Sequence, residues 1–285
     1  MGFKENMQEK LKEKLKKEEL EILPAGFQNL GDIIILNLNK ELLGKKIEIG
    51  EKVLELYPKV RAVYNKEGDI SGEFREPQLI FIAGDKEKKE AEVIENGIRY
   101  KFDVTKLMFA KGNINERVRV AGEVKPGEII VDMFGGIGYF SVPIGKISLA
   151  KKVYTIEKNP NAFHYLNENI KINHIGNIET FNGDNRKIID NLVEKGIKAD
   201  RIVMGYLPPP KEFLPWAFKI SKKGTIIHYE DLLNDENLKE EEKKVMDFVE
   251  GEAEKQGMKV KLIKLVRVKN YKPHVGHYVV DVVVV

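Results

Sequence analysis

The segment Val131-Asp-Met-Phe-Gly-Gly-Ile-Gly-Tyr-Phe140 decides the fold, because an acidic residue stands between an apolar strand and a glycine-rich turn. The apolar run Glu128–Val131 leads into the segment, and an amphipathic helix is expected to begin after the glycines. Glycines in such a turn let the backbone approach a nucleotide closely. The order of strand, glycine turn and helix therefore predicts an α/β nucleotide-binding fold.

The residues around this turn argue against a dinucleotide as the ligand. Ser141 follows Gly136-Ile-Gly138-Tyr-Phe, so the third glycine of a G-x-G-x-x-G motif is missing. The carboxylate of Asp132 would also repel a pyrophosphate at close range. S-adenosylmethionine carries an ammonium and a sulfonium group and has no phosphate. The acidic residue therefore favours S-adenosylmethionine as the cofactor.

Two further acidic residues follow at positions that suit an adenosine ligand. Glu157 ends the next apolar strand, where a carboxylate can accept both ribose hydroxyls. Asp184 comes after another helix and strand, where it could accept the adenine amino group. Each acid alone is consistent with a helix cap or a solvated loop end. Three acids in order, after three strands of one alternating pattern, predict a cofactor site.

The pattern after residue 128 alternates between short strands and helices, which predicts a mostly parallel sheet. The ending departs from this pattern, because two strong strands follow each other with only residues 269–277 between them. A parallel sheet with a final antiparallel hairpin is the Rossmann-like fold of class I S-adenosylmethionine enzymes. The expected strands are 128–132, 153–157, 178–181, 201–205, 225–229, 260–268 and 278–285.

The region before residue 86 has a different organisation, and it predicts a small α+β domain over residues 1–85. A charged amphipathic helix is expected over residues 5–22. Residues 86–285 then form the cofactor-binding domain. Near its start, Asn96-Gly97 predicts a hairpin with a type I′ turn over residues 92–103.

Composition bounds the class of protein. The 285 residues contain no Cys, which excludes a disulfide framework, a cysteine zinc site and a cysteine nucleophile. His228, His274 and His277 have no metal-ligand spacing, so no metal is expected. The chain opens without a secretory signal, and no apolar run reaches about 18 residues, so a cytoplasmic protein with no membrane partner is expected. A net charge of +3 indicates that any basic patch is local.

Residues 96–206 resemble the archaeal and eukaryotic enzymes that modify position 37 of tRNA. Two sister groups share this scaffold: the guanosine-37 N1-methyltransferases and the aminocarboxypropyl transferases of wybutosine synthesis. The similarity continues through Ile227-His-Tyr229 and the closing hairpin. The matching segments are Glu95–Ile98, Asp103–Phe109, Asn115–Arg119, Val131–Gly138, Ile156–Pro160, Gly183–Arg186 and Asp200–Gly205.

Two departures favour the aminocarboxypropyl group. The methyltransferases carry Phe-Ser-Pro-Arg where this chain has Phe109-Ala-Lys-Gly112. They also carry Asn-Leu-Pro where this chain has Gly205-Tyr-Leu207. The resemblance thus implies transfer of the 3-amino-3-carboxypropyl group of S-adenosylmethionine to 4-demethylwyosine at position 37 of tRNA(Phe), releasing methylthioadenosine. It also implies binding to an anticodon loop with a modified guanosine, with residues 1–85 a candidate for tRNA contact.

The resemblance and the three acids together identify the expected site residues, although no catalytic residue is identified. Tyr206 and Pro208 are expected to contact the substrate base. The expected cofactor-binding residues are Arg117, Asp132, Phe134, Gly135, Gly138, Glu157, Lys158, Asp184 and Asn185.

Three other functions stay open at this point. The first is methylation of guanosine-37, because the cofactor would be the same. The second is a non-catalytic protein that binds tRNA and the cofactor. The third is a methyltransferase acting on a small molecule or a protein.

Overall fold

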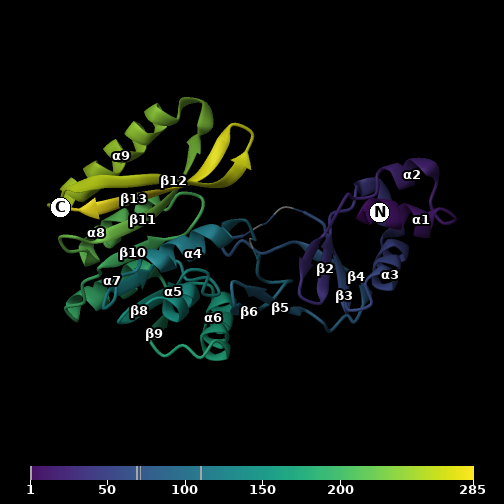
Figure 1. Ribbon diagram of the computed structural model, residues 1–285, viewed down its shortest axis with the longest axis horizontal. Coiled ribbons are helices and arrows are strands. Elements are labelled where there is room, and N and C mark those ends of the chain that lie inside the picture. The colour runs from purple at the N-terminus through teal and green to yellow at the C-terminus, as the bar shows by residue number, and fades with distance from the viewer. Residues whose placement is uncertain (1, 69, 71, 110) are drawn as a thin grey trace. The chain divides into compact units, whose positions relative to one another are not determined.

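Figure 1 shows the computed structural model, which describes residues 2–68, 70, 72–109 and 111–285. The chain divides into two compact units. The first comprises Met1–Glu95 and Arg99–Phe109, and the second comprises Asn96–Ile98 and Ala110–Val285. The domain division after residue 85 stays a prediction from the sequence.

The first unit is built on a four-stranded sheet in the order β1-β2-β3-β4. Helix α3 packs on β3 and β4, and α1 packs on α3. Strands β5 and β6 form a separate hairpin, whose turn residues Asn96 and Gly97 have φ of 50° and 76°, as a type I′ turn requires. The elements are α1 (Phe3–Leu11), α2 (Lys17–Glu21), β1 (Gln28–Leu30), β2 (Ile33–Leu36), α3 (Lys46–Leu56), β3 (Ala62–Lys66), β4 (Leu79–Gly84), β5 (Glu90–Glu95) and β6 (Ile98–Asp103).

The N-terminal helix differs from the prediction, because residues 5–22 form two helices instead of one. Helix α1 ends at Leu11 and α2 begins at Lys17. Met7, Leu11 and Leu15 are all buried, so the predicted apolar stripe does face the core. Leu15 reaches that core from the turn between the helices, and a continuous helix is therefore not needed to bury the stripe.

The second unit contains a seven-stranded sheet in the order β12-β13-β11-β10-β7-β8-β9. The neighbours from β9 to β11 are all parallel, and β13 runs antiparallel to both β11 and β12. This arrangement confirms the predicted Rossmann-like sheet with its final hairpin. The strands are β7 (Ile129–Asp132), β8 (Lys152–Glu157), β9 (Ile178–Asn182), β10 (Arg201–Met204), β11 (Ile226–Asn234), β12 (Val260–Lys272) and β13 (Val275–Val284).

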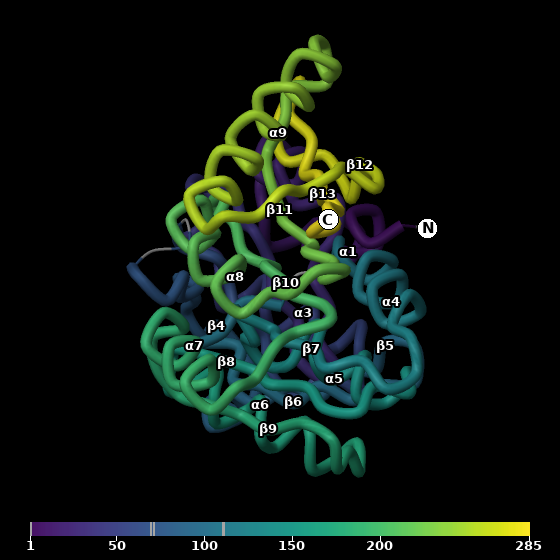
Figure 2. Tube along the Cα trace, turned by 90° about the vertical axis from the view of Figure 1, so that its left-hand side faces the viewer, coloured from purple at the N-terminus to yellow at the C-terminus, as the bar shows by residue number. Residues whose placement is uncertain are grey.

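Helices cover both faces of this sheet. Figure 2 shows α4 and α5 on one side and α7, α8 and α9 on the other. Each face has its own buried apolar cluster, with Val120 and Ile144 on the α4 side and Leu192 and Phe218 on the α7 side. The helices are α4 (Ile114–Glu123), α5 (Ser141–Ile147), α6 (Pro160–Ile172), α7 (Asn185–Glu194), α8 (Leu214–Ile220) and α9 (Leu238–Lys255).

The last three strands are longer than the sequence pattern suggests. Strand β11 continues to Asn234, because β13 pairs with it from Ile226↔Val283 to Asn234↔Val275. The hairpin strands likewise extend to Lys272 and begin again at Val275. Glu230 and His277 therefore lie within paired strands, where their side chains have defined directions.

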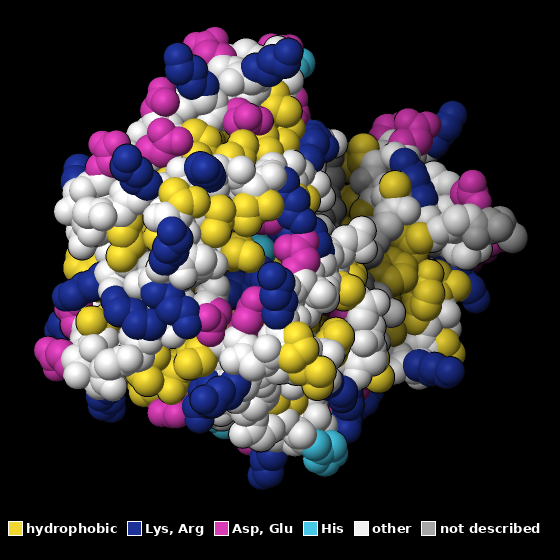
Figure 3. Space-filling view, turned by 60° about the vertical axis from the view of Figure 1, so that its left-hand side comes forward, with side chains coloured by type: hydrophobic (Ala, Val, Ile, Leu, Met, Phe, Trp, Pro, Cys, Tyr) yellow, Lys and Arg dark blue, Asp and Glu magenta, His cyan; other side chains and the backbone are white. Residues whose placement is uncertain are grey.

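Surface features agree with the modest net charge. On the face shown in Figure 3, Lys and Arg side chains are interspersed with Asp and Glu side chains and with apolar patches. Among the described residues, no helix is both long and apolar enough to cross a bilayer.

Candidate active site

The sheet register brings the predicted acids to one edge. Asp132, the last residue of β7, pairs with Thr155 of β8 and with Val203 of β10. Glu157 ends β8 next to it. Ligands of open α/β sheets bind outside the carboxyl ends of the parallel strands. The acids therefore lie where such a fold presents a ligand site.

The glycine turn packs directly on β8. The Gly135 N–H donates to the carbonyl of Ile156 at 2.8 Å. A Cβ atom on Gly135 would lie 2.4 Å from Cγ2 of Thr155, and one on Gly138 would lie 2.3 Å from Cγ2 of Val142. Gly138 also has φ of +97°, which L side chains rarely adopt. Both glycines are thus required for the close approach of the turn to the sheet.

Asp132 is a fully buried carboxylate that is incompletely satisfied. Its Oδ1 accepts the Phe134 N–H at 3.2 Å, and the backbone and hydroxyl of Ser141 lie close enough to favour its ionised form, while Oδ2 has no partner that meets hydrogen-bond geometry among the residues the structure describes. Burial raises the pKa of Asp132 to about 7, and the nearby charge of Glu157 adds to this shift. A cationic ligand beside Asp132 would stabilise its ionised form.

Glu157 is held in place by backbone donors. Its Oε2 accepts the Gly136 N–H and its Oε1 accepts the Asn159 N–H, both at 2.6 Å. Burial raises the pKa of Glu157, and these backbone N–H groups oppose that shift. Each carboxylate oxygen can accept a second hydrogen bond. The side chain can therefore anchor the glycine turn and still accept ribose hydroxyls.

Asp184 and Asn185 begin helix α7. Asp184 caps the helix by accepting the Arg186 N–H at 2.9 Å, and its Oδ2 lies 2.5 Å from the Arg186 guanidinium. The hydrogen bond from Arg186 lowers the pKa of Asp184 to about 2, and the charge of Lys158 contributes. Asn185 donates to the carbonyl of Met133 at 3.1 Å, which ties α7 to the glycine turn.

Aromatic rings gather above this edge. Phe134 and Tyr206 stack with centroids 5.1 Å apart and an angle of 19° between their planes. Phe213 meets Phe134 edge-on at 5.1 Å, and the Arg186 guanidinium lies over Phe213 at 5.3 Å. Flat apolar surfaces of this kind are suited to stacking on a purine.

The remaining predicted residues lie on flanking segments. Arg117 of α4 is buried, and its guanidinium stacks on the Tyr139 ring at 4.4 Å. The loop after β10 contains a cis Leu207–Pro208 peptide bond. The departure at Phe109-Ala-Lys-Gly112 includes Ala110, which lies outside the described residues.

Hydrogen bonds and ring contacts thus join most of the predicted site residues around the glycine turn. Arg186 and Phe213 were not singled out from the sequence, although both contact predicted residues. Arg186 lies two residues after Asp184, which is a weak sequence signal. Phe213 ends a short 3-10 helix (Lys211–Phe213) seven residues after Tyr206, and only the fold brings it to Phe134.

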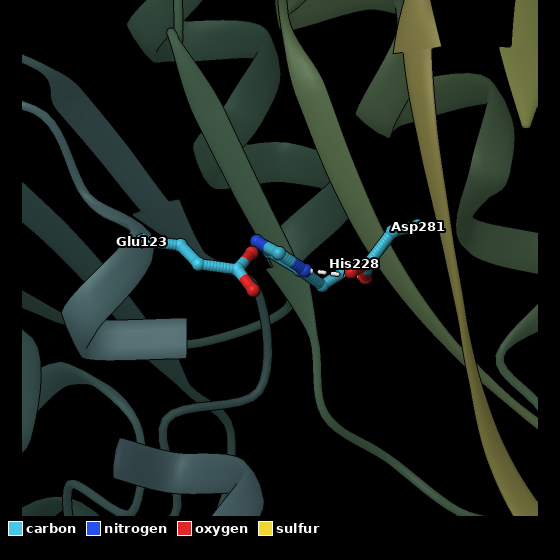
Figure 4. A group of neighbouring side chains, drawn as sticks. All are labelled: Glu123, His228 and Asp281. Carbon is cyan, nitrogen blue, oxygen red and sulfur yellow. Dashed lines mark hydrogen bonds and ion pairs between the residues drawn. The ribbon is translucent and has the colours of Figure 1, made fainter. Parts of the chain in front are cut away.

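Glu123, His228 and Asp281 form a second polar cluster (Figure 4), with ligand-type atoms within 4.8 Å of one another. The Arg201 guanidinium lies 2.7 Å from Nε2 of His228, and Nδ1 lies 2.5 Å from Asp281. Because arginine only donates, Nε2 accepts and the Nδ1–H donates to Asp281. His228 is therefore held in its Nδ1–H form.

Cationic side chains surround the carboxylates of this cluster. Arg119 lies 2.7 Å from Asp281 and 2.9 Å from Glu123, and Lys264 also pairs with Glu123. Burial alone would raise the pKa of Asp281, but His228 and Arg119 hold it below its usual value. Since these cations already neutralise the carboxylates, we assign the cluster a structural role rather than a metal-binding one.

Comparison with known families gives two matches. The TRM5/TYW2 methyltransferase domain matches residues 91–261. The TYW2 N-terminal domain matches residues 7–87. Together the two families account for nearly the whole chain.

Similar proteins include members of both sister groups. The chain is 40% identical to a tRNA(Phe) (4-demethylwyosine(37)-C(7)) aminocarboxypropyltransferase of Methanocaldococcus jannaschii, covering 90% of this chain and 96% of the relative. It is also 40% identical to the tRNA (guanine(37)-N(1))-methyltransferase Trm5b of Pyrococcus abyssi, but there the match covers 73% of this chain and 60% of the relative.

Two solved structures of TYW2 proteins are similar to this chain. TYW2 of P. horikoshii in complex with MeSAdo is similar with a TM-score of 0.83 and 34% identity, covering 99% of both chains. M. jannaschii TYW2 in complex with AdoMet has a TM-score of 0.72 and 31% identity, covering 91% of this chain and 99% of that one.

Proposed function

This chain belongs to the TRM5/TYW2 family, and from that premise we propose that it is an S-adenosylmethionine-dependent tRNA aminocarboxypropyltransferase. It transfers the 3-amino-3-carboxypropyl group to C7 of 4-demethylwyosine at position 37 of tRNA(Phe) and releases methylthioadenosine. The end-to-end match to an aminocarboxypropyltransferase supports this reaction over guanosine-37 methylation.

One observation in the structure carries the choice between the sister reactions. Gly205 occupies the position where the methyltransferases have an asparagine. A Cβ atom there would lie 2.4 Å from Cε2 of Phe140, so the Phe140 ring fills the space that any side chain would need. The site therefore offers no amide at residue 205 to hold the edge of an unmodified guanine.

The residues around the glycine turn fit the cofactor. Glu157 has lone pairs left for ribose hydroxyls, and within the part of the chain that the structure describes, Oδ2 of Asp132 lacks a partner with hydrogen-bond geometry. The sulfonium of S-adenosylmethionine activates three neighbouring carbons, and the one that faces the nucleophile reacts. The protein selects the carbon by position and alignment. We assign Glu157, Asp184, Phe134 and the turn glycines to holding the adenosine, and Asp132 to the cationic end of the cofactor, with Lys158 and Asn185 beside them.

The tRNA substrate requires a surface that accepts a flat base. The Phe134–Tyr206 stack and the loop with Pro208 lie at the carboxyl end of β10, next to the glycine turn. A base from the anticodon loop can stack on such rings once it leaves its own stack. We assign Tyr206 and Pro208 to this contact, with Arg117 available to neutralise the cofactor carboxylate or a tRNA phosphate.

Two labelled forms of S-adenosylmethionine test the function. With tRNA(Phe) that carries 4-demethylwyosine, label in the cofactor carboxyl group should enter the tRNA, because only aminocarboxypropyl transfer delivers that carbon. Label in the methyl group should leave as methylthioadenosine. Unmodified guanosine-37 tRNA should take up neither label.

The alternative functions predict different results. A guanosine-37 methyltransferase would move methyl label into unmodified tRNA and no carboxyl label into either tRNA. A non-catalytic binding protein would retain both labels in the cofactor. A methyltransferase for small molecules or proteins would leave both tRNAs unlabelled. Any of these outcomes contradicts the proposal.

A further inference from the structure

The register of the second unit places a buried acid beside the cofactor edge. Asp132 pairs with Val203, and Val203 pairs with His228 of β11. Paired residues of neighbouring strands point to the same face, and residues two apart on one strand do so as well. Glu230 therefore points to the same face as Asp132. It lies two residues beyond His228, closer to the carboxyl ends of the parallel strands, and is level with Gly205.

The neighbouring strands add two basic side chains on that face. Val279 of β13 pairs with Glu230, and His277 lies two residues before Val279. Lys269 of β12 pairs with His277. Nε2 of His277 lies 3.3 Å from Oε2 of Glu230. The three side chains thus come from three adjacent strands and meet at one end of the sheet.

Glu230 and His277 have unused hydrogen-bonding capacity in spite of their burial. Glu230 is 4% exposed and His277 is fully buried. Among the described residues, Oε1 of Glu230 and both ring nitrogens of His277 lack a partner with hydrogen-bond geometry. Buried polar atoms in native proteins are nearly always satisfied, so this pair is suited to a ligand or substrate.

Lys269 links this pair to the predicted site. Its side chain is half-buried, and burial lowers its pKa, as does the charge of Arg117, while Glu230 raises it. Lys269 therefore lies within electrostatic range of Arg117, which stacks on Tyr139 of the glycine turn. On this face, Glu230 and Arg117 are thus the charged groups that act on Lys269.

We propose that Glu230 is the general base of the reaction and accepts the proton from C7 of 4-demethylwyosine, with His277 beside its carboxylate. This assignment rests on the proposed function. Aminocarboxypropyl transfer to a ring carbon needs such a base, because the carbon carries a hydrogen that the product lacks.

The electron balance is complete without any other reactant. The π electrons at C7 form the bond to Cγ of the methionine moiety. The Cγ–S bond breaks, and its electron pair stays on sulfur, which leaves as neutral methylthioadenosine. The C7–H electrons return to the ring and restore its conjugation, while the proton moves to the Glu230 carboxylate.

Glu230→Gln keeps the shape of the side chain but cannot accept the proton at C7. We expect turnover with 4-demethylwyosine tRNA to fall by about 10²–10⁴-fold, the range of general-base catalysis. Affinity for methylthioadenosine should stay within about threefold of the wild type. Glu230→Asp retains a carboxylate and should recover part of the lost rate.

Asp231→Asn is the matched control, because Asp231 is also a buried carboxylate on β11. It points to the opposite face, where its Oδ1 accepts the Leu232 N–H at 2.7 Å. Turnover of this variant should stay within about threefold of the wild type. If Glu230→Gln and Asp231→Asn lost turnover to a comparable extent, and Glu230→Asp were no faster than Glu230→Gln, the role of Glu230 would be structural.

Deuterium at C7 of the substrate separates chemistry from folding. In Glu230→Gln, proton removal becomes rate-limiting, so deuterium should slow turnover further. Turnover of Glu230→Gln within about threefold of the wild type, or a loss without deuterium dependence, overturns the assignment. If the wild type fails to transfer carboxyl label to tRNA, the proposed function is wrong instead, and the two failures are thus distinguishable.

Discussion

At the scale of single residues, Glu157 combines a structural and a ligand role, because backbone donors already hold both of its oxygens. Glu157→Ala should weaken methylthioadenosine binding by roughly tenfold or more, since hydrogen bonds to a charged group contribute about 1.5–3 kcal/mol each. Calorimetry measures this loss. Glu179→Ala, an exposed acid on β9 that pairs with Lys152, is the control and should bind normally. Equal affinities of the two variants would contradict the assignment.

Gly205 is the second residue whose identity matters, because Phe140 occupies the space beside it. Gly205→Ala should lower the free energy of unfolding by about 1–3 kcal/mol, the usual cost of overpacking a core. Thermal denaturation measures it. Gly176→Ala is the control, since no described atom lies within 4 Å of the position its Cβ would take. In the double variant Gly205→Ala/Phe140→Leu, the smaller leucine side chain should recover part of the lost stability. Stability losses that simply add in the double variant would argue against this contact.

At the scale of elements, helix α4 carries Arg117 toward the site and is tied to β13 by its neighbour Arg119. The Arg119 guanidinium bonds to Glu116 and to Asp281, both of which are buried. Arg119→Ala should cost about 3–5 kcal/mol, because it leaves buried carboxylates without their cation. Arg99→Ala removes the exposed pair with Glu92, which solvent screens, and should leave the midpoint of urea denaturation close to that of the wild type. Urea denaturation of both variants tests the difference, and similar midpoints would refute it.

At the scale of the whole molecule, Asp132 and Asp184 make the free energy of unfolding depend on pH in opposite directions. The two effects fall in separate pH ranges. The pKa of Asp132 is raised from 3.8 to about 7, so the folded state binds a proton more tightly than the unfolded state. Its contribution to the free energy of unfolding is therefore lost as the pH rises from about 4 to about 7. The pKa of Asp184 is lowered to about 2, and its stabilisation is lost only as the pH falls from about 4 to about 2.

The same shift of Asp132 predicts a pH-dependent affinity. Binding of cationic S-adenosylmethionine should strengthen as the pH rises toward about 7, because the cation favours ionised Asp132. Neutral methylthioadenosine should show a weaker dependence. Calorimetry at several pH values measures both. Asp132→Asn should remove the difference between the two ligands, and a difference that persists in this variant would show that another group is responsible.

The sequence by itself determined the kind of fold and the order of its parts. Strand and helix periods are local, so the alternation after residue 128 and the final hairpin could be predicted without coordinates. The glycine turn and the acids Asp132 and Glu157 could also be placed, because each follows directly from the end of a strand. The Asn96-Gly97 turn was predictable for the same reason, since its backbone angles depend on those two residues.

Tertiary structure alone decided which distant residues meet. The length of β11 depends on pairing with β13, so the position of Glu230 inside a strand was not visible in its own neighbourhood. The same pairing brings His277 to Glu230 from 47 positions away in the chain. The filling of the Gly205 position by Phe140 likewise depends on packing between β10 and the glycine turn. Register and packing are long-range properties, and no local sequence period encodes them.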